Sequence, residues 1–213
     1  IEIDERLIDV LDYTLAEYDN VKIINEDILK LDLKKVIDDE FNGEKVSIAA
    51  NLPYYITTPI ITKLLEEKLP IKNIVVMVQK EVAERMSAKP STKDYGAITV
   101  LCQYYTEPSI VANVPASLFV PPPKVDSAVL KLKVLDKPSV EVKDEGVFFR
   151  VVKAAFSQRR KTLLNCLSAN FPIPKDEIST LLESIGIAPS RRGETLSLKE
   201  FANIADTLLQ KIK

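Results

Sequence analysis

The feature that most constrains this fold is a regular alternation of strand-like and helix-like segments through the first half of the sequence. The pattern predicts strands at Ile1–Ile3, Val21–Ile24, Val46–Ala50, Asn73–Val78, Ser109–Val114 and Ser127–Leu135. It predicts helices at Asp4–Tyr18, Thr58–Lys68, Glu81–Ala88 and Gly96–Tyr105. Such alternation favours a parallel sheet with helices on both faces. The last two strands have no long helix between them, which predicts an antiparallel addition at one edge.

The C-terminal third has a different pattern. The polar stretch Asp136–Gly146 contains a proline and a glycine and is typical of a linker. After it, helices are predicted at Val147–Phe156, Lys161–Ala169, Lys175–Ile185 and Leu198–Lys211. The sequence therefore predicts an α/β domain over residues 1–136 and a small all-helical domain over residues 137–213.

Composition excludes several classes of protein. The chain has 213 residues, 46% of them hydrophobic, and no apolar run approaches the length of a membrane span. It contains no histidine, which removes serine–histidine catalysis and histidine-ligated zinc, and no metal site is expected. Cys102 and Cys166 lie in apolar segments without metal-ligand spacing, so we expect buried free thiols in a cytoplasmic protein.

Charge is distributed unevenly along the chain. Residues 1–50 carry 6 basic and 14 acidic residues, a net charge of −8, whereas residues 147–213 carry 11 basic and 6 acidic residues, a net charge of +5. A basic C-terminal third on an acidic protein indicates a module that faces a polyanion. A solvated helical face is the alternative.

The strongest chemical signal is the tetrapeptide Asn51-Leu52-Pro53-Tyr54, directly after a predicted strand. Ligands bind at the carboxyl ends of strands in an open parallel sheet. Asn51 supplies a side-chain carbonyl and Pro53 leaves its backbone carbonyl free to accept, beside the flat face of Tyr54. Such a set suits a flat base with an exocyclic amine. The simpler interpretation is an ordinary strand-to-helix turn.

This tetrapeptide resembles the active-site motif of the amino methyltransferases, and in particular of the ribosomal RNA adenine dimethyltransferase family (KsgA type). Further blocks match that family in order: Glu2-Ile3-Asp4, Glu26-Asp27-Ile28-Leu29, Gln79–Arg85, Tyr95-Gly96, Phe119–Ser127 and Phe156–Leu163. The resemblance covers nearly the whole chain. It implies a Rossmann-like methyltransferase sheet, S-adenosylmethionine as cofactor, and N6,N6-dimethylation of adenosines in small-subunit ribosomal RNA during ribosome biogenesis.

The resemblance also implies roles for single residues. Glu2 would accept hydrogen bonds from the cofactor ribose and Asp27 from its adenine amine, and Asn51 would border both cofactor and target. For Glu2 the alternative is a solvated charge, and for Asp27 a helix cap. Asn51 with the Leu52–Pro53 carbonyls would hold the target amine, while Tyr54 and Phe119 would sandwich the flipped base.

The segment Arg159-Arg160-Lys161 is a candidate phosphate-binding patch. A single helix through it would turn Arg159 to the apolar side, whereas a break near Gln158 would present both arginines. Arg191-Arg192 would extend the patch. A solvated charged face is again the alternative.

The family's glycine-rich loop has no counterpart in this sequence. We therefore expect the first strand of the sheet to be missing from the chain, and we expect weaker binding of S-adenosylmethionine than in a protein that contains the loop.

Three other functions compete with the small-subunit dimethyltransferase. One is a catalytically inactive RNA-binding factor in ribosome assembly, and another is a large-subunit rRNA adenine methylase. The third, a nicotinamide oxidoreductase, is disfavoured because the tetrapeptide has no role in hydride transfer. The expected partner is small-subunit ribosomal RNA or a pre-ribosomal subunit, with no membrane, and the chain is expected to be a monomer.

Overall fold

The computed structural model describes residues 1–212 and divides them into two compact units. One unit comprises residues 1–46 and 55–71, and the other comprises residues 47–54 and the described residues from 72 onward. Each unit is described by itself below. No helix in the described part of the chain is long and apolar enough to cross a membrane.

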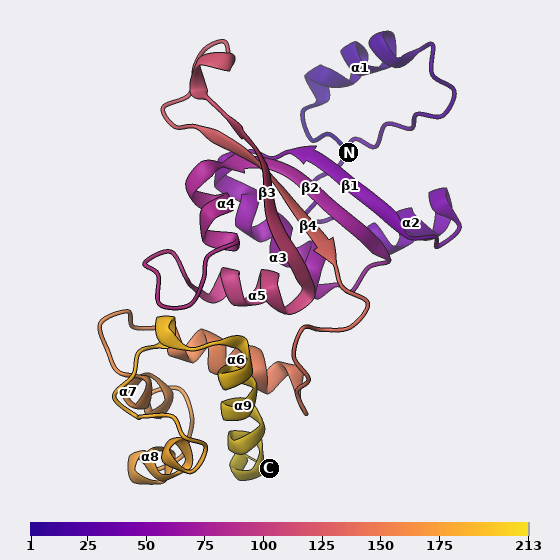
Figure 1. Ribbon diagram of the computed structural model, residues 1–213. Helices are drawn as coiled ribbons and strands as arrows, with labels where there is room; N and C mark the ends of the chain where they lie inside the picture. The colour runs from indigo at the N-terminus through magenta and orange to yellow at the C-terminus, as the bar shows by residue number, and fades with distance from the viewer. Residues whose placement is uncertain (213) are drawn as a thin grey trace. The chain divides into compact units, whose positions relative to one another are not determined.

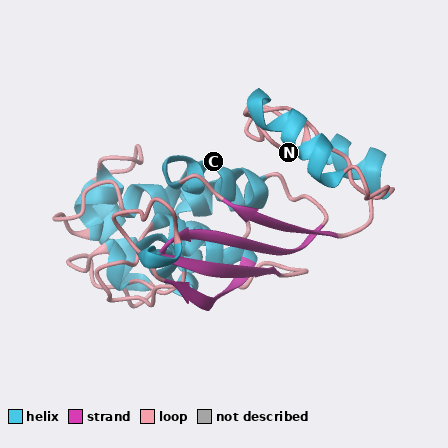
Figure 2. Ribbon diagram, turned by 90° about the horizontal axis from the view of Figure 1, so that it is seen from above, coloured by secondary structure: helices cyan, strands magenta, loops and turns pink. Residues whose placement is uncertain are grey.

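A four-stranded sheet dominates the second unit (Figures 1 and 2). The strands are β1 (Val46–Asn51), β2 (Ile71–Gln79), β3 (Thr106–Val114) and β4 (Ser127–Val134), in the order β1-β2-β4-β3. Both β2 and β3 pair antiparallel with β4, which confirms the predicted antiparallel edge. Hydrogen bonds from Val46 N to Pro70 O and from Leu52 N to Met77 O advance in the same direction along both chains, as in a parallel pair.

One face of the two central strands, β2 and β4, is fully buried. The alternating residues of β2 and β4 on that face are at most 1% exposed: Ile74, Val76, Val78, Ala128, Leu130 and Leu132. Helices α4 (Lys80–Met86) and α5 (Ala97–Tyr105) contact the sheet through β3 and β4. The burial explains why these strands are rich in β-branched and leucine side chains.

The C-terminal helices are α6 (Glu145–Ala155), α7 (Leu163–Ser168), α8 (Lys175–Ser184) and α9 (Leu198–Ile212). All four predicted helices are confirmed, and no helix or strand forms across residues 135–144, where the linker was predicted. Apart from Cys166, the buried side chains of these helices form one cluster with Tyr95, Val100 and Tyr104, which lie in and just before α5. The boundary at residue 136 remains a prediction.

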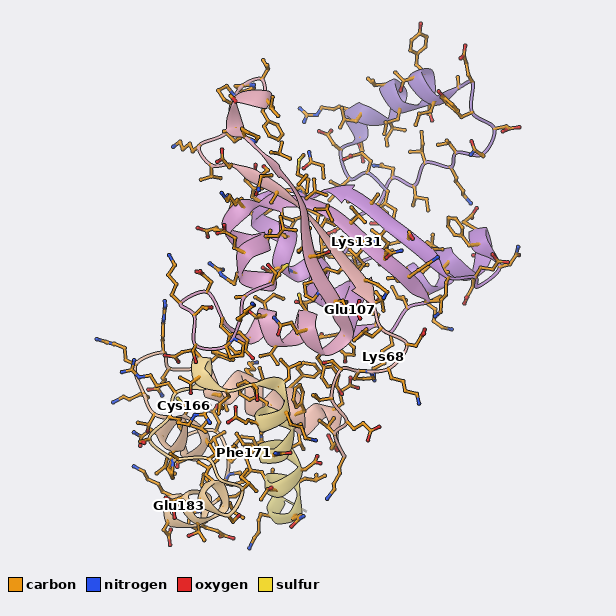
Figure 3. The ribbon with its side chains drawn as sticks, viewed as in Figure 1. Lys68, Glu107, Lys131, Cys166, Phe171 and Glu183 are labelled. Atoms are coloured by element: carbon orange, nitrogen blue, oxygen red, sulfur yellow. The ribbon has the colours of Figure 1, made fainter. Side chains whose placement is uncertain are left out.

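Both cysteines are buried and free, as predicted from the sequence. Burial raises the pKa of the Cys102 thiol to about 12, which keeps it protonated. Cys166 lies on α7 among the C-terminal helices (Figure 3). Its exposed fraction is 1%, and the thiol donates toward Gln158 O. Both residues are therefore packing residues.

The first unit contains α1 (Ile8–Leu15), α2 (Leu33–Phe41) and α3 (Thr57–Glu66). The strands predicted at Ile1–Ile3 and Val21–Ile24 are wrong, because only a single parallel bridge forms there, between Glu2 and Asn25. An isolated bridge does not provide the repeated pairing that makes a strand. The sequence reading also missed α2, whose N-terminus is capped by Asp32.

Candidate active site and cationic cleft

The predicted tetrapeptide lies where strand β1 ends. Asn51 is the last residue of that strand and is exposed. The Leu52 N–H donates a hydrogen bond of 3.1 Å to Met77 O of β2, and Leu52 is only 6% exposed. The backbone bond and the buried side chain fix the turn against the neighbouring strand. Asn51 is thereby held at the end of the sheet with its amide accessible.

Tyr54 is anchored to the sheet through its hydroxyl group. The Tyr54 Oη lies 2.8 Å from the Ser127 Oγ, and Ser127 is the fully buried first residue of β4. The Tyr54 side chain is only half-buried. One end of the ring is therefore fixed by a hydrogen bond while part of its surface remains accessible for stacking.

Phe119 lies in the loop of residues 115–126, which joins β3 to β4 and forms the tip of a long hairpin (Figure 1). The Ala116 N–H donates to Asp126 Oδ1 at 2.9 Å, and this bond closes the loop at its base. The Asp126 carbonyl accepts from the Lys80 N–H at 2.9 Å, which ties the loop to the start of α4. The half-buried Phe119 is thus carried on a braced loop.

These three side chains belong to the same end of the sheet. Strands β1 and β2 end there, and β4 begins there. The structure thus places Asn51, Tyr54 and Phe119 at the carboxyl ends of the parallel strands, where open α/β sheets bind their ligands.

Glu2 and Asp27 lie together in the first unit. The backbone of Glu2 exchanges hydrogen bonds with Ile24 and Glu26 at 3.0 and 3.1 Å, which brings Glu2 beside the segment that leads into Asp27. Glu2 Oε1 accepts from the Asp4 N–H, and Asp27 Oδ1 accepts from the Leu29 N–H. The residues after Asp27 form a turn and no helix begins there, so the alternative of a helix cap at Asp27 is wrong.

This pair fits the nucleoside part of the expected cofactor. Carboxylates accept hydrogen bonds only, and the ribose hydroxyls and adenine amine of S-adenosylmethionine are donors. The neighbouring Asp4 is paired with Arg6, whose side-chain hydrogen bond lowers the pKa of Asp4 to about 2. Asp4 is therefore already paired with the Arg6 guanidinium. Glu2 and Asp27 are the nearby carboxylates expected to accept hydrogen bonds from the cofactor.

Arg159, Arg160 and Lys161 occupy an exposed turn between α6 and α7. Helix α6 ends at Ala155 and α7 begins at Leu163, so of the two arrangements considered for this segment the chain adopts the break near Gln158. Arg159 donates from Nη2 to the Lys93 carbonyl at 3.2 Å. The break presents both arginines to solvent.

The two arginines open onto a cavity of about 720 Å³, which we call the cationic cleft. Its basic lining residues are Arg85, Lys93, Arg159, Arg160 and Arg192, and its acidic lining residues are Asp94 and Glu194. Lys161 lies outside it, over a smaller hollow of about 280 Å³. The cleft also contains Tyr95, whose buried hydroxyl has no hydrogen-bond partner among the described residues.

The sequence reading missed Arg85 and Lys93 as members of this surface. Arg85 stood at the end of a block that matched the family, but nothing in its local pattern gave it a role. Lys93 lies in a polar loop, more than 60 residues before the arginines that it joins. The loop after α4 is joined to the C-terminal segment by hydrogen bonds from Ser91 N to Glu194 O and from Arg159 to Lys93 O, and these tertiary contacts bring the cations together.

Arg191 and Arg192 have separate roles. Arg192 is exposed and lines the cleft, whereas Arg191 forms an ion pair with Glu200 and donates to Thr195. Burial alone would raise the pKa of Glu200, but hydrogen bonds from Arg191 and Ser197 outweigh it, and the net pKa is lowered. Arg191 thus holds the turn that carries Arg192, and the predicted extension of the patch applies to Arg192.

The fold and the site together define an α/β enzyme with a Rossmann-like sheet. Its accessible amide and aromatic side chains lie at the carboxyl ends of the parallel strands, and a cationic cleft lies in the same unit. The family model for ribosomal RNA adenine dimethylase matches residues 1–210. The chain therefore belongs to the ribosomal RNA adenine dimethylase family, and it is an S-adenosylmethionine-dependent rRNA adenine methyltransferase.

Curated relatives agree with this family. The chain is 54% identical over 212 residues to the ribosomal RNA small subunit methyltransferase A of Bacillus mycoides, covering 98% of this chain and 73% of the relative. It is 55% identical to the protein of that name from Bacillus cytotoxicus, with the same coverage.

Solved structures show the same fold. A dimethyladenosine transferase from Plasmodium falciparum superimposes with a TM-score of 0.76 and 27% identity, over 95% of this chain and 78% of that one. The 23S rRNA methyltransferase ErmE has a TM-score of 0.69 and 24% identity, over 98% of this chain and 80% of that one. The likeness to ErmE supports only the shared fold.

Proposed function

We propose that this protein dimethylates adenosines of small-subunit ribosomal RNA at N6 during ribosome biogenesis, with the target amine held by the Asn51–Tyr54 turn. The observation that carries the proposal is the geometry of that turn: Leu52 is locked to β2, Asn51 is exposed, and Tyr54 is fixed by Ser127. The names of the relatives that are more than half identical to this chain support the small subunit as substrate.

The chemistry required of the protein is mainly positioning. The adenine N6 amine is a poor nucleophile because its lone pair is delocalised into the ring. The Asn51 side-chain carbonyl and the backbone carbonyls of Leu52 and Pro53 accept the amine hydrogens, which favours a lone pair that points out of the ring plane. S-adenosylmethionine, when bound, supplies the electrophilic methyl group. Alignment and electrostatics then account for most of the catalysis, without a strong general base.

Aromatic stacking completes the pocket. Tyr54 and Phe119 lie on separate elements at one end of the sheet, and each has an accessible ring surface. A flipped adenine stacks between two such rings, which offsets part of the cost of leaving the RNA stack. Glu2 and Asp27 hold the cofactor by accepting from its ribose hydroxyls and adenine amine.

The RNA backbone is held elsewhere on the protein. Arg159, Arg160 and Lys161 are exposed, and the first two share the cationic cleft with three further cations. Phosphate contacts of this kind supply affinity and orientation without reading sequence. In this proposal the segment 137–213 is a helical RNA-binding domain, and the protein acts as a cytoplasmic monomer on rRNA or a pre-ribosomal subunit.

Methyl transfer to purified small ribosomal subunits tests the proposal. The full-length enzyme should transfer methyl groups to adenosine N6, and Asn51→Ala should lower the single-turnover rate by about a hundredfold, the usual cost of losing one polar group at a reacting centre. RNA affinity should hardly change, because phosphate contacts dominate it.

Asn203→Ala in α9 is the matched control, because it makes the same substitution in a C-terminal helix, outside the Asn51–Tyr54 turn. It should retain the wild-type rate. A wild-type rate in Asn51→Ala would instead mean that the tetrapeptide is only a structural turn.

A further inference from the structure

The tip of the β3–β4 hairpin exposes two large aliphatic side chains on either side of Phe119. Val120 is fully exposed at 101% and Leu118 is 71% exposed. Isolated exposed aliphatic residues are common on protein surfaces. Here, however, two of them flank an aromatic residue of the candidate site and are followed by three consecutive prolines.

The loop that carries them is braced at several points. The Leu118 N–H donates to Pro115 O at 3.1 Å, and the Phe119 N–H donates to Ala116 O at 3.2 Å. The Ala116 N–H reaches back to Asp126 across the loop. Because proline fixes its own φ angle, the segment after Val120 has little conformational freedom. The two aliphatic side chains are thus presented outward from a stiff support.

The charges of the loop also suit an RNA strand. Its two charged residues are Lys124 and Asp126. Both are exposed, and the Asp126 carboxylate is already engaged at the base of the loop, where it accepts from the Ala116 N–H. In a nucleic acid, negatively charged phosphates lie beside the stacked bases. A cation beside exposed aliphatic side chains can therefore contact a phosphate while the aliphatic side chains contact the bases.

We propose that Leu118 and Val120 form an apolar wedge that enters the RNA stack beside the target adenosine and occupies the space that the flipped base leaves. The inference rests on the proposed role of Tyr54 and Phe119 in holding that base. Extrusion of a base breaks its stacking contacts, and proteins that distort nucleic acids insert leucine or other apolar side chains between base steps to replace them. A wedge beside Phe119 places this replacement next to the pocket that receives the base.

Single-turnover methylation of two RNAs tests the wedge in the full-length enzyme. In the first RNA the target adenosine is stacked between its neighbours; in the second the neighbouring nucleotides are abasic, so that no stack has to be broken. The double variant Leu118→Ala/Val120→Ala should be slower by roughly tenfold or more on the stacked RNA and close to wild type on the abasic-flanked RNA. Leu118→Met/Val120→Ile should restore the rate on the stacked RNA.

The matched control is Ile110→Ala/Val111→Ala, which removes two exposed aliphatic side chains from β3 of the same hairpin, outside the loop. It should behave as wild type on both RNAs. All variants should keep the thermal midpoint of the wild type within a few degrees, because exposed substitutions have small effects on stability.

A wild-type rate on the stacked RNA would overturn the wedge, and so would equal losses on the two RNAs, since those would place the side chains in the pocket or the fold. Failure of the underlying site looks different. Tyr54→Ala and Phe119→Ala should slow methylation of both RNAs. Wild-type rates in these two variants would contradict the proposed base pocket, independently of the results for the wedge variants.

Discussion

At the scale of single residues, Tyr54 combines two tasks that are normally separate. Its hydroxyl group is fixed at 2.8 Å from the Ser127 Oγ, and its half-exposed ring is left for stacking. The first task is structural and the second serves binding. Substitutions can therefore separate the two.

We predict that Tyr54→Phe keeps most of the methyl-transfer rate, because the ring face survives and only one hydrogen bond is lost. Tyr54→Ala should cost about 1–3 kcal/mol of stabilisation of the bound base. Tyr54→Leu should recover part of that loss, because apolar contact survives without the flat surface. Single-turnover kinetics at saturating cofactor measure the series. A loss in Tyr54→Phe as large as that in Tyr54→Ala would show that the hydroxyl matters more than the ring.

At the scale of elements, the turn between α6 and α7 is the part of the C-terminal region best suited to bind phosphate. We predict that the triple variant Arg159→Ala/Arg160→Ala/Lys161→Ala weakens RNA binding regardless of sequence. The dependence of log affinity on log salt should become shallower by roughly 0.7–0.9 per lost contact, because fewer counterions are released. Titrations of RNA at several salt concentrations measure this slope.

The control for that titration is the triple variant Lys137→Ala/Lys175→Ala/Lys199→Ala, which removes three exposed cations outside the cationic cleft. Its salt slope should stay near that of the wild type. If both triple variants changed the slope equally, binding would depend on total charge and not on this turn.

Gly193, at the start of the short turn that follows Arg192, is packed against the end of α6. A Cβ atom there would lie 2.6 Å from the Ala155 carbonyl oxygen, which is backbone and cannot move aside cheaply. We predict that Gly193→Ala lowers the free energy of unfolding by about 1–3 kcal/mol, the usual cost of overpacking. Urea denaturation measures it. Gly96→Ala is the control, because a Cβ there meets nothing within 4 Å, and an equal loss in both variants would contradict the steric explanation.

At the scale of the whole molecule, helix α5 connects two cores within the second unit. Val100 and Tyr104 belong to the apolar cluster of the C-terminal helices, whereas Leu101 and Cys102 are buried outside that cluster. Figure 1 shows α5 between the sheet and the C-terminal helices. A helix buried on two sides couples the regions that pack against it.

We therefore predict one cooperative thermal transition for the sheet of this unit and the C-terminal helices. Phe201→Ala, in the helical core, should cost about 3–5 kcal/mol, and Leu132→Ala, in the sheet core, about 2–5 kcal/mol. Both residues are fully buried, and both variants should shift the same transition in calorimetry. Two transitions, each shifted by only one variant, would show that the segments on either side of residue 136 fold independently.

Local sequence determined the features that depend on near neighbours. The Asn51–Tyr54 turn after a strand, the break near Gln158 and the four C-terminal helices were all predictable, because helix periodicity, proline and capping residues act over a few positions. The antiparallel edge was predictable for the same reason. A parallel pair needs a crossover connection, which is usually a helix, and no helix was predicted between these two strands.

Tertiary structure decided the features that depend on distant partners. The segments Ile1–Ile3 and Val21–Ile24 have strand-like composition but form one bridge, because a strand exists only where a neighbour pairs along it. Arg85 and Lys93 enter the cationic cleft, and Arg191 leaves it for Glu200, through packing that no local pattern encodes. The sequence specified the chemical groups of the protein, while the three-dimensional packing selected which of them are neighbours, because distances between residues far apart in the chain are set only when the core forms.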